Sequence, residues 1–197
     1  MSKGQATRQS ILEHATSLAS RIGLEALSIG KLAEALNLSK SGLFAHFRSK
    51  EALQIQVMEH AAERFVETVI KPALKAPRGI PRIQAIFERW RKWPEANSMD
   101  GGCLFVAAAT ELDDRPGPAR DYLVQQQKDW QETLATIART AISEGHFSDD
   151  VDPEQFAFEL YGIMLAYHFS SRLGIDPAAD QKAERAFKAL LAKSQIH

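Results

Sequence analysis

The fold of this chain is decided by residues 28–50, SIGKLAEALNLSKSGLFAHFRSK. Apolar residues at helical spacing predict one short helix on each side of a tight turn. Ser28 and Ser39 are good N-caps for these helices, and Asn37 tolerates the left-handed backbone that such a turn requires. Leu38 is expected to be buried beneath the turn. This layout is a helix-turn-helix, a unit that places its second helix in a DNA major groove.

The second helix of this unit carries polar residues away from its apolar side, and these are the candidate DNA contacts. Lys40 and Ser41 can donate to base edges, and Gly42 lets the backbone approach DNA closely. Phosphate contacts fix affinity and register without reading sequence. The candidates for them are Ser28, Lys31, His46 and Lys50. The alternative is an ordinary pair of core helices with a solvated charged face.

The rest of the chain also predicts helices and no strands, so the fold class is all-α. Proline and glycine residues divide the sequence at intervals, and hairpin signals such as Asn-Gly are absent. Nine helices are expected, over 7–22, 29–36, 40–47, 50–70, 80–93, 102–112, 118–144, 153–173 and 177–194.

Composition narrows the class of protein. The chain has 197 residues, 45% of them hydrophobic, which is enough for one or two small domains with a core. No apolar run approaches the roughly 18 residues of a membrane span, and the polar N-terminus does not resemble a signal peptide. A single cysteine excludes an intramolecular disulfide and fits a reducing cytoplasm, the expected location.

Charge is distributed unevenly along the chain. Residues 1–50 contain seven lysines and arginines and three glutamates, a formal charge of +4, whereas the remainder carries −5. A basic N-terminal segment on an acidic body favours contact with a polyanion at one end only, although a chance fluctuation is the alternative. No catalytic triad, metal-ligand pattern or phosphate loop is present, so no metal, cofactor or enzymatic activity is expected.

The segment from about Thr7 to Leu53 resembles the DNA-binding domain of the TetR (tetracycline repressor) family of bacterial regulators. The matching pieces are ILEHA (11–15) with Gly23, KLAEAL (31–36), LSKSGLFAHF (38–47) and SKEAL (49–53). Two positions depart from the family pattern. Asn37 stands where the family often has glycine, and Phe44 replaces a tyrosine whose hydroxyl contacts DNA. Phe44 is therefore expected to pack against a sugar or a thymine methyl.

The resemblance implies the organisation and role of the chain. A DNA-binding domain over 1–48 would precede a ligand-binding and dimerisation domain over 49–197, joined by a connecting helix at 49–72. The implied function is a repressor that binds a palindromic double-stranded DNA operator as a homodimer and is released by a small-molecule effector. The alternative is an all-helical small-molecule-binding protein or enzyme without a DNA-binding role.

The expected dimer face lies on the last two helices. Small residues allow close helix approach where they follow one another along one side of a helix, at four-residue spacing in the first of the two. The candidate interface residues are Gly162, Ala166, Ser170, Ala183 and Ala186. An intrachain core contact is the alternative for the same pattern.

The expected effector pocket lies among the aromatic residues of the middle helices, since small-molecule sites are apolar with few polar groups. The candidates are Phe87, Trp90, Cys103, Phe105, Tyr122, Trp130 and His168. A plain aromatic core is the alternative for each. Cys103, near a predicted helix start, is either a reactive sensor or a small core residue.

Overall fold

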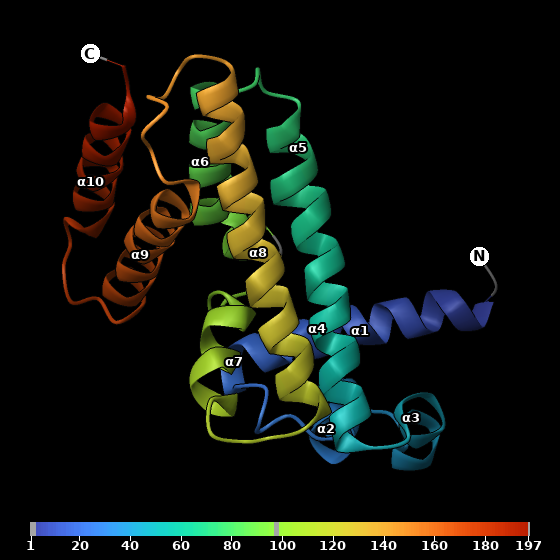
Figure 1. The fold of residues 1–197 in the computed structure, drawn as a ribbon. Coiled ribbons are helices and arrows are strands. Elements are labelled where there is room, and N and C mark those ends of the chain that lie inside the picture. Colours follow the sequence, from blue (N-terminus) through green and yellow to red (C-terminus); the bar gives the residue numbers. More distant parts are fainter. Residues whose placement is uncertain (1–2, 97–98, 197) are drawn as a thin grey trace. The chain divides into compact units, whose positions relative to one another are not determined.

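The computed structural model describes residues 3–96 and 99–196, which form helices and no β-strand (Figure 1). The α-helices are α1 (Lys3–Ile22), α2 (Ile29–Leu36), α3 (Lys40–Phe47), α4 (Lys50–Phe65), α5 (Lys71–Leu74), α6 (Ile80–Ala96), α7 (Leu104–Leu112), α8 (Pro118–Ser143), α9 (Pro153–Arg172) and α10 (Ala179–Ser194). A π-helical turn, η1 (Val66–Ile70), joins α4 to α5. The chain packs as two compact units, one of residues 1–65 and 94–126 and one of 66–93 and 127–197.

The predicted all-α class is confirmed. With α4, η1 and α5 counted as one uninterrupted helical stretch, the described residues contain the nine stretches that the sequence predicts. The predicted domain boundary at residue 48 is a functional division, and it stays a prediction because packing units need not follow it.

Several helix ends differ from the sequence prediction, among them the start of α1 at Lys3, and two of the differences have a clear physical cause. The fourth predicted helix does not run as a regular α-helix to Ile70, because its hydrogen bonding widens to the π pattern at Val66. The helix predicted to stop at residue 93 continues through Pro94 to Ala96. Proline lacks an N–H donor, but at the third position from a helix end this removes only one intrahelical hydrogen bond.

The tight turn after α2 forms as predicted, with one correction. Asn37 has φ 52° and ψ 43°, and its N–H donates to the Glu34 carbonyl at 3.2 Å. The Leu38 N–H donates to the Ala33 carbonyl at 2.9 Å, which completes a Schellman cap. The prediction that Leu38 is buried is wrong, since its side chain is 47% exposed. The left-handed residue before it turns the chain so that Leu38 faces solvent.

The predicted caps also form. The Ser28 hydroxyl oxygen accepts from the Lys31 N–H at 3.2 Å, and the Ser39 oxygen accepts from the Gly42 N–H at 3.1 Å. These bonds satisfy backbone donors that the first turn of each helix leaves free. The sequence therefore specifies where α2 and α3 begin, and with them the direction of the side chains that follow.

One apolar core holds the N-terminal helices together. Its fully buried members include Ala15 and Ala19 of α1, Leu32 of α2, Phe47 of α3 and Leu53 of α4. Each lies on the inward face that the helical spacing predicts. Packing on this core fixes α3, and it leaves the opposite face of α3 free.

The second unit has its own core of α6, α8, α9 and α10. The rings of Phe147 and Phe156 lie 5.0 Å apart between centroids. Arg91 of α6 pairs with Asp180 and Glu184 of α10, and its guanidinium lies 5.2 Å from the Phe87 ring centroid. These contacts attach α10 to α6 within the unit.

The buried His60 and the partly buried His168 are expected to make the protein less stable in acid. Burial lowers the pKa of His60 of α4, although Glu63 and Glu13 oppose this, and burial with a contribution from Arg172 lowers the pKa of His168 of α9. The unfolded chain binds more protons below its ordinary histidine pKa of about 6.5. Stability is therefore complete above that pH and falls below it, by at most about 1.4 kcal/mol per pH unit for each histidine.

Urea denaturation between pH 8 and pH 5.5 measures this dependence. Replacing His60 and His168 by Gln is expected to flatten the fall, whereas replacing the exposed His14 is not. An equally steep fall in the double variant would show that other groups cause it.

Candidate nucleic-acid interface

The outer face of α2 and α3 gathers most of the predicted DNA contacts. A shallow hollow is lined by Ser28, Ile29, Gly30, Lys40, Ser41, Phe44 and Lys50. Five of the eight predicted residues are thus brought together, while Lys31, Gly42 and His46 lie outside the lining. All eight are exposed except Ser28, which is partly buried.

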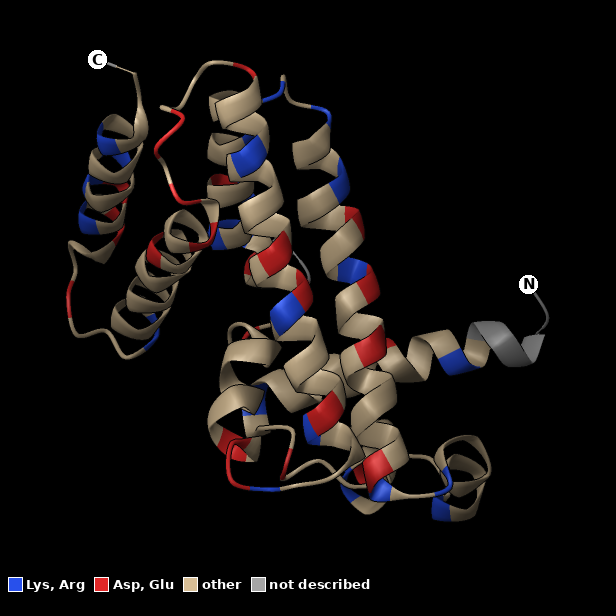
Figure 2. Ribbon diagram, in the orientation of Figure 1, with Lys and Arg blue, Asp and Glu red and all other residues tan. Residues whose placement is uncertain are grey.

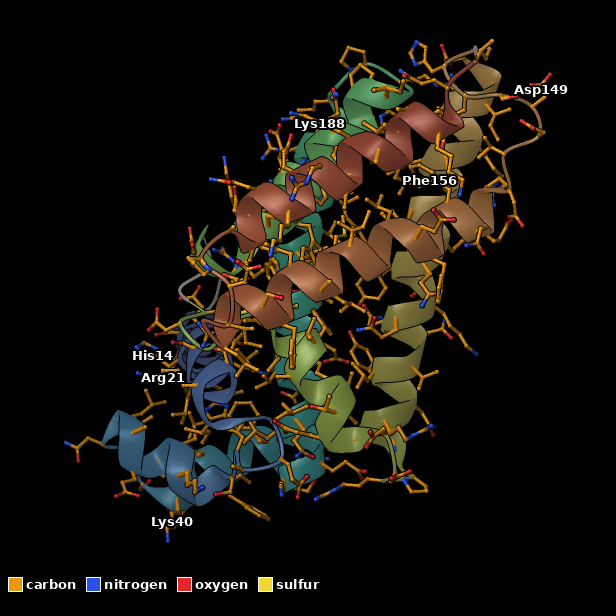
Figure 3. All side chains as sticks on the ribbon, turned by 90° about the vertical axis from the view of Figure 1, so that its left-hand side faces the viewer. His14, Arg21, Lys40, Asp149, Phe156 and Lys188 are labelled. Atoms are coloured by element: carbon orange, nitrogen blue, oxygen red, sulfur yellow. The ribbon has the colours of Figure 1, made fainter. Side chains whose placement is uncertain are left out.

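Lys40 is the first residue of α3, and its side chain extends away from the ribbon (Figure 3). No ion pair in the described part of the chain engages Lys31 or Lys40, so both ammonium groups are available to an anion. Between residues 28 and 50 there are four basic residues and one acidic residue, Glu34. Figure 2 shows blue segments on α3 and at the start of α4. The face is therefore positive, as contact with phosphate requires.

Ser41 and Phe44 present different chemistry on the same helix. The Ser41 hydroxyl lies 3.4 Å from the Ser39 oxygen, in the first turn of α3. Phe44 is 57% exposed, although a phenylalanine gains free energy by burial. An exposed ring beside lysine and serine is suited to apolar contact with a sugar or a thymine methyl.

The absence of a side chain at Gly42 also has a structural role, besides allowing close approach to DNA. A Cβ atom at this position would lie 3.0 Å from the Ser39 oxygen, which caps α3. Any larger residue would press on that cap. The sequence prediction included the approach of DNA to Gly42 but not the contact between this position and the Ser39 cap.

Lys50 is placed differently from the other candidates. Its ammonium donates to Glu25 Oε1 at 2.7 Å, so this predicted phosphate contact already has an anionic partner. Glu25 also accepts from Arg115 at 2.8 Å. Sequence reasoning missed both ion pairs of Glu25, because they span 25 and 90 positions and follow no periodic pattern.

Sequence reasoning also missed Arg48, an exposed cation between Lys40 and Lys50. It follows α3 with a positive φ of 59°, and its N–H donates to the Phe44 carbonyl at 2.9 Å. A left-handed non-glycine residue at a helix end carries strain, which the surrounding structure must hold. Its positive charge and its position between Lys40 and Lys50 were the sequence signals that could have indicated a phosphate contact.

The predicted effector residues are divided between the two units. Phe87, Trp90, Trp130 and His168 belong to the second unit, and Cys103, Phe105 and Tyr122 to the first. The Phe87 ring stacks on Phe187 with centroids 4.1 Å apart, and the Trp90 and His168 rings meet edge-on at 6.4 Å. These rings pack as a core does, and their role in ligand binding stays a prediction.

Cys103 stands at the N-cap position of α7 without a capping hydrogen bond from its side chain, and it is buried, with 4% of its surface exposed. A thiol so covered meets oxidants or electrophiles only after local opening. In the described part of the chain, no three histidine, cysteine, aspartate or glutamate side chains are grouped to hold a metal ion.

Four of the five predicted dimer residues lie along a groove between α9 and α10, which run side by side (Figure 1). Gly162, Ala166, Ser170 and Ala186 line it. Ala183 does not, because it is buried within its own unit with 6% exposure. None of the described helices is both long and apolar enough to cross a membrane.

Two family models match the chain. Residues 11–57 match the model of bacterial regulatory proteins of the tetR family, and residues 79–187 match that of the tetracyclin repressor-like C-terminal domain. Together with the helix-turn-helix geometry, these matches define a DNA-binding transcriptional regulator with an N-terminal reader and a C-terminal ligand-binding domain. The chain belongs to the TetR family.

Solved structures agree with this assignment. A TetR-family regulator from Cytophaga hutchinsonii is 21% identical with a TM-score of 0.86, over 100% of this chain and 98% of that one. A TetR regulator from Chloroflexus aurantiacus is 26% identical with a TM-score of 0.84, over 98% and 96%. AibR, solved with isovaleryl coenzyme A and operator DNA, is 22% identical with a TM-score of 0.69, over 90% and 94%. No curated protein sequence matches the chain.

Proposed function

We propose that this regulator is a repressor that binds a palindromic operator as a homodimer and leaves it when a small-molecule effector binds. The observation that carries the proposal is the exposed basic hollow at α2 and α3, where Lys40, Ser41 and Phe44 face outward together. One such helix buries too little surface for strong specificity, so two copies would be needed. In a two-fold dimer their spacing would match half-sites about 34–36 Å apart.

The outer surface of α9 supports the dimer. Phe158 and Phe169 are 70% and 60% exposed, and Gly162 and Ala166 lie between them on the same side of the helix. Exposed apolar side chains around small residues are typical of a helix face that packs against another protein surface. A second copy of α9 and α10 would cover this stripe and fill the groove.

The effector would act by binding the operator-competent and released states with different affinity. The C-terminal domain would determine which chemical class of effector binds, and its aromatic side chains would offer apolar contacts to that molecule. AibR was solved with both an acyl coenzyme A and operator DNA, which is consistent with coupled sites in this fold. The protein would work in the cytoplasm, where its operator lies.

The proposal is tested by selecting genomic DNA fragments that the purified protein binds and sequencing them. A palindrome bound tightly, with affinity that falls steeply as salt rises, is the expected result. Adding candidate effectors chosen from neighbouring genes should then release the DNA. Failure to enrich any fragment would leave the chain a ligand-binding protein without a DNA-binding role.

Replacing Lys40 by Ala is expected to weaken operator binding by about 1–3 kcal/mol, since a lysine to guanine contact is worth that much. Fluorescence anisotropy on the selected operator measures the change. Lys128→Ala removes an exposed lysine from α8 and is the matched control, expected to bind like the wild type. Equal affinities for the Lys40 variant and the wild type would exclude Lys40 from the interface.

A further inference from the structure

Glu25 lies in the centre of a charged cluster within the first unit. Its Oε1 accepts from Lys50 at 2.7 Å and from Arg115 at 2.8 Å, and its Oε2 accepts from the Gln54 amide at 3.4 Å. The Glu25 backbone N–H donates to Glu111 Oε2 at 2.7 Å. The start of α4 and the connection after α7 thus meet at the Glu25 carboxylate, and the end of α7 holds the Glu25 backbone.

One carboxylate oxygen of Glu25 serves two cations, and Lys50 and Arg115 remain 44% and 57% exposed. The pKa of Glu25 is lowered, chiefly by the hydrogen bond from Lys50. Glu25 is therefore ionised at neutral pH and stands beside the hollow that Lys50 lines.

We propose that Glu25 competes with a DNA phosphate for the ammonium of Lys50, and that Arg115 sets the outcome by neutralising Glu25. This inference rests on the proposed function, because it assumes that Lys50 contacts operator phosphate. Glu25 is a positioning residue, since its effect on DNA acts through Lys50.

The geometry gives the competition a direction. While Arg115 engages Glu25 Oε1, the carboxylate holds Lys50 less strongly and its charge repels phosphate less. If Arg115 moves away, Glu25 holds Lys50 more strongly, and the DNA face loses one positive charge that attracts phosphate. Arg115 lies in the connection between α7 and α8, outside the helix-turn-helix but within the first unit. A movement of that connection would therefore change DNA affinity without moving α3.

The experiment measures operator affinity against salt concentration for Glu25→Gln, Arg115→Gln and the double variant. Glutamine keeps the size of Glu25 and removes its charge. Since exposed ion pairs have small energies, Glu25→Gln is expected to raise affinity about two- to fivefold, and Arg115→Gln to lower it about twofold. In the Glu25→Gln background, Arg115→Gln should have little further effect.

Two controls separate competition from a general change of charge. Glu34→Gln removes an equal charge from α2, where no ion pair to Lys50 is present, and is expected to change affinity less. In a Lys50→Ala background, Glu25→Gln should lose most of its effect. Circular dichroism melts confirm that each variant is folded.

The possible results are distinct. Operator binding that Glu25→Gln leaves unchanged, or raises equally with and without Lys50, would overturn this inference and leave the proposed function standing. Wild-type protein that binds no DNA in a salt-sensitive way would overturn both.

Discussion

Phe47→Ala is expected to lower the free energy of unfolding by about 3–5 kcal/mol, the usual loss when a buried aromatic side chain is removed. Phe47 is fully buried at the end of α3, in the core shared by the N-terminal helices. The remaining side chains cannot fill the cavity, because α3 is short and its cap and turn fix it at both ends. The loss should therefore concentrate in the helix-turn-helix.

Guanidinium denaturation followed by circular dichroism measures this loss, and hydrogen exchange of the α2 and α3 amides locates it. The matched control is Phe44→Ala, which removes the same ring from an exposed position of the same helix. That variant should be as stable as the wild type but bind operator less tightly. If both variants lost equal stability, the assignment of inner and outer faces of α3 would be wrong.

Ala166→Arg is expected to convert the proposed dimer to monomers and to abolish tight operator binding. Ala166 is exposed in one protomer and lines the groove between α9 and α10, so a charge there costs the isolated protomer little. In the dimer the same charge would be buried without a partner, which costs several kcal/mol. Each 1.4 kcal/mol weakens association tenfold, so the dimer constant should rise by at least about a hundredfold.

Sedimentation equilibrium measures the association, and anisotropy measures operator binding by the same samples. Ala192→Arg is the control, because Ala192 is exposed on α10 but does not line the groove. It should remain dimeric and bind normally. A dimeric Ala166 variant would place the subunit contact elsewhere.

The local features of the reader could be predicted because each depends on a few neighbouring residues. Ser28, Ser39 and Asn37 cap and turn the helices by bonds that span at most five positions. Leu38 shows the limit of this reasoning, since its apolar side chain suggested burial but the turn geometry decided its direction. Pro94 shows the same limit at a helix end, where the cost of proline is small.

Features that join distant parts of the chain could not be predicted. The contact of Glu25 with Arg115 spans 90 positions and depends on how α7 packs against α1 and α4. The seven effector candidates were chosen by the type of their side chains. Side-chain type does not indicate that these residues belong to two different units. Only the folded chain shows which of these side chains meet.

Gly101 has a further consequence for how the first unit can move. A Cβ atom there would lie 1.5 Å from the carbonyl oxygen of Ser20, so the backbone before α7 rests directly on the end of α1. The Gly101 N–H also donates to the Ser20 hydroxyl at 3.4 Å, so the two segments are held together as well as in contact. Because packed interiors transmit strain, any displacement of the backbone at Gly101 toward Ser20 must displace the last turn of α1 as well. The last turn of α1 leads directly into the connection to α2. The backbone contact that Gly101 permits therefore limits how far the segment before α7 can move toward the helix-turn-helix.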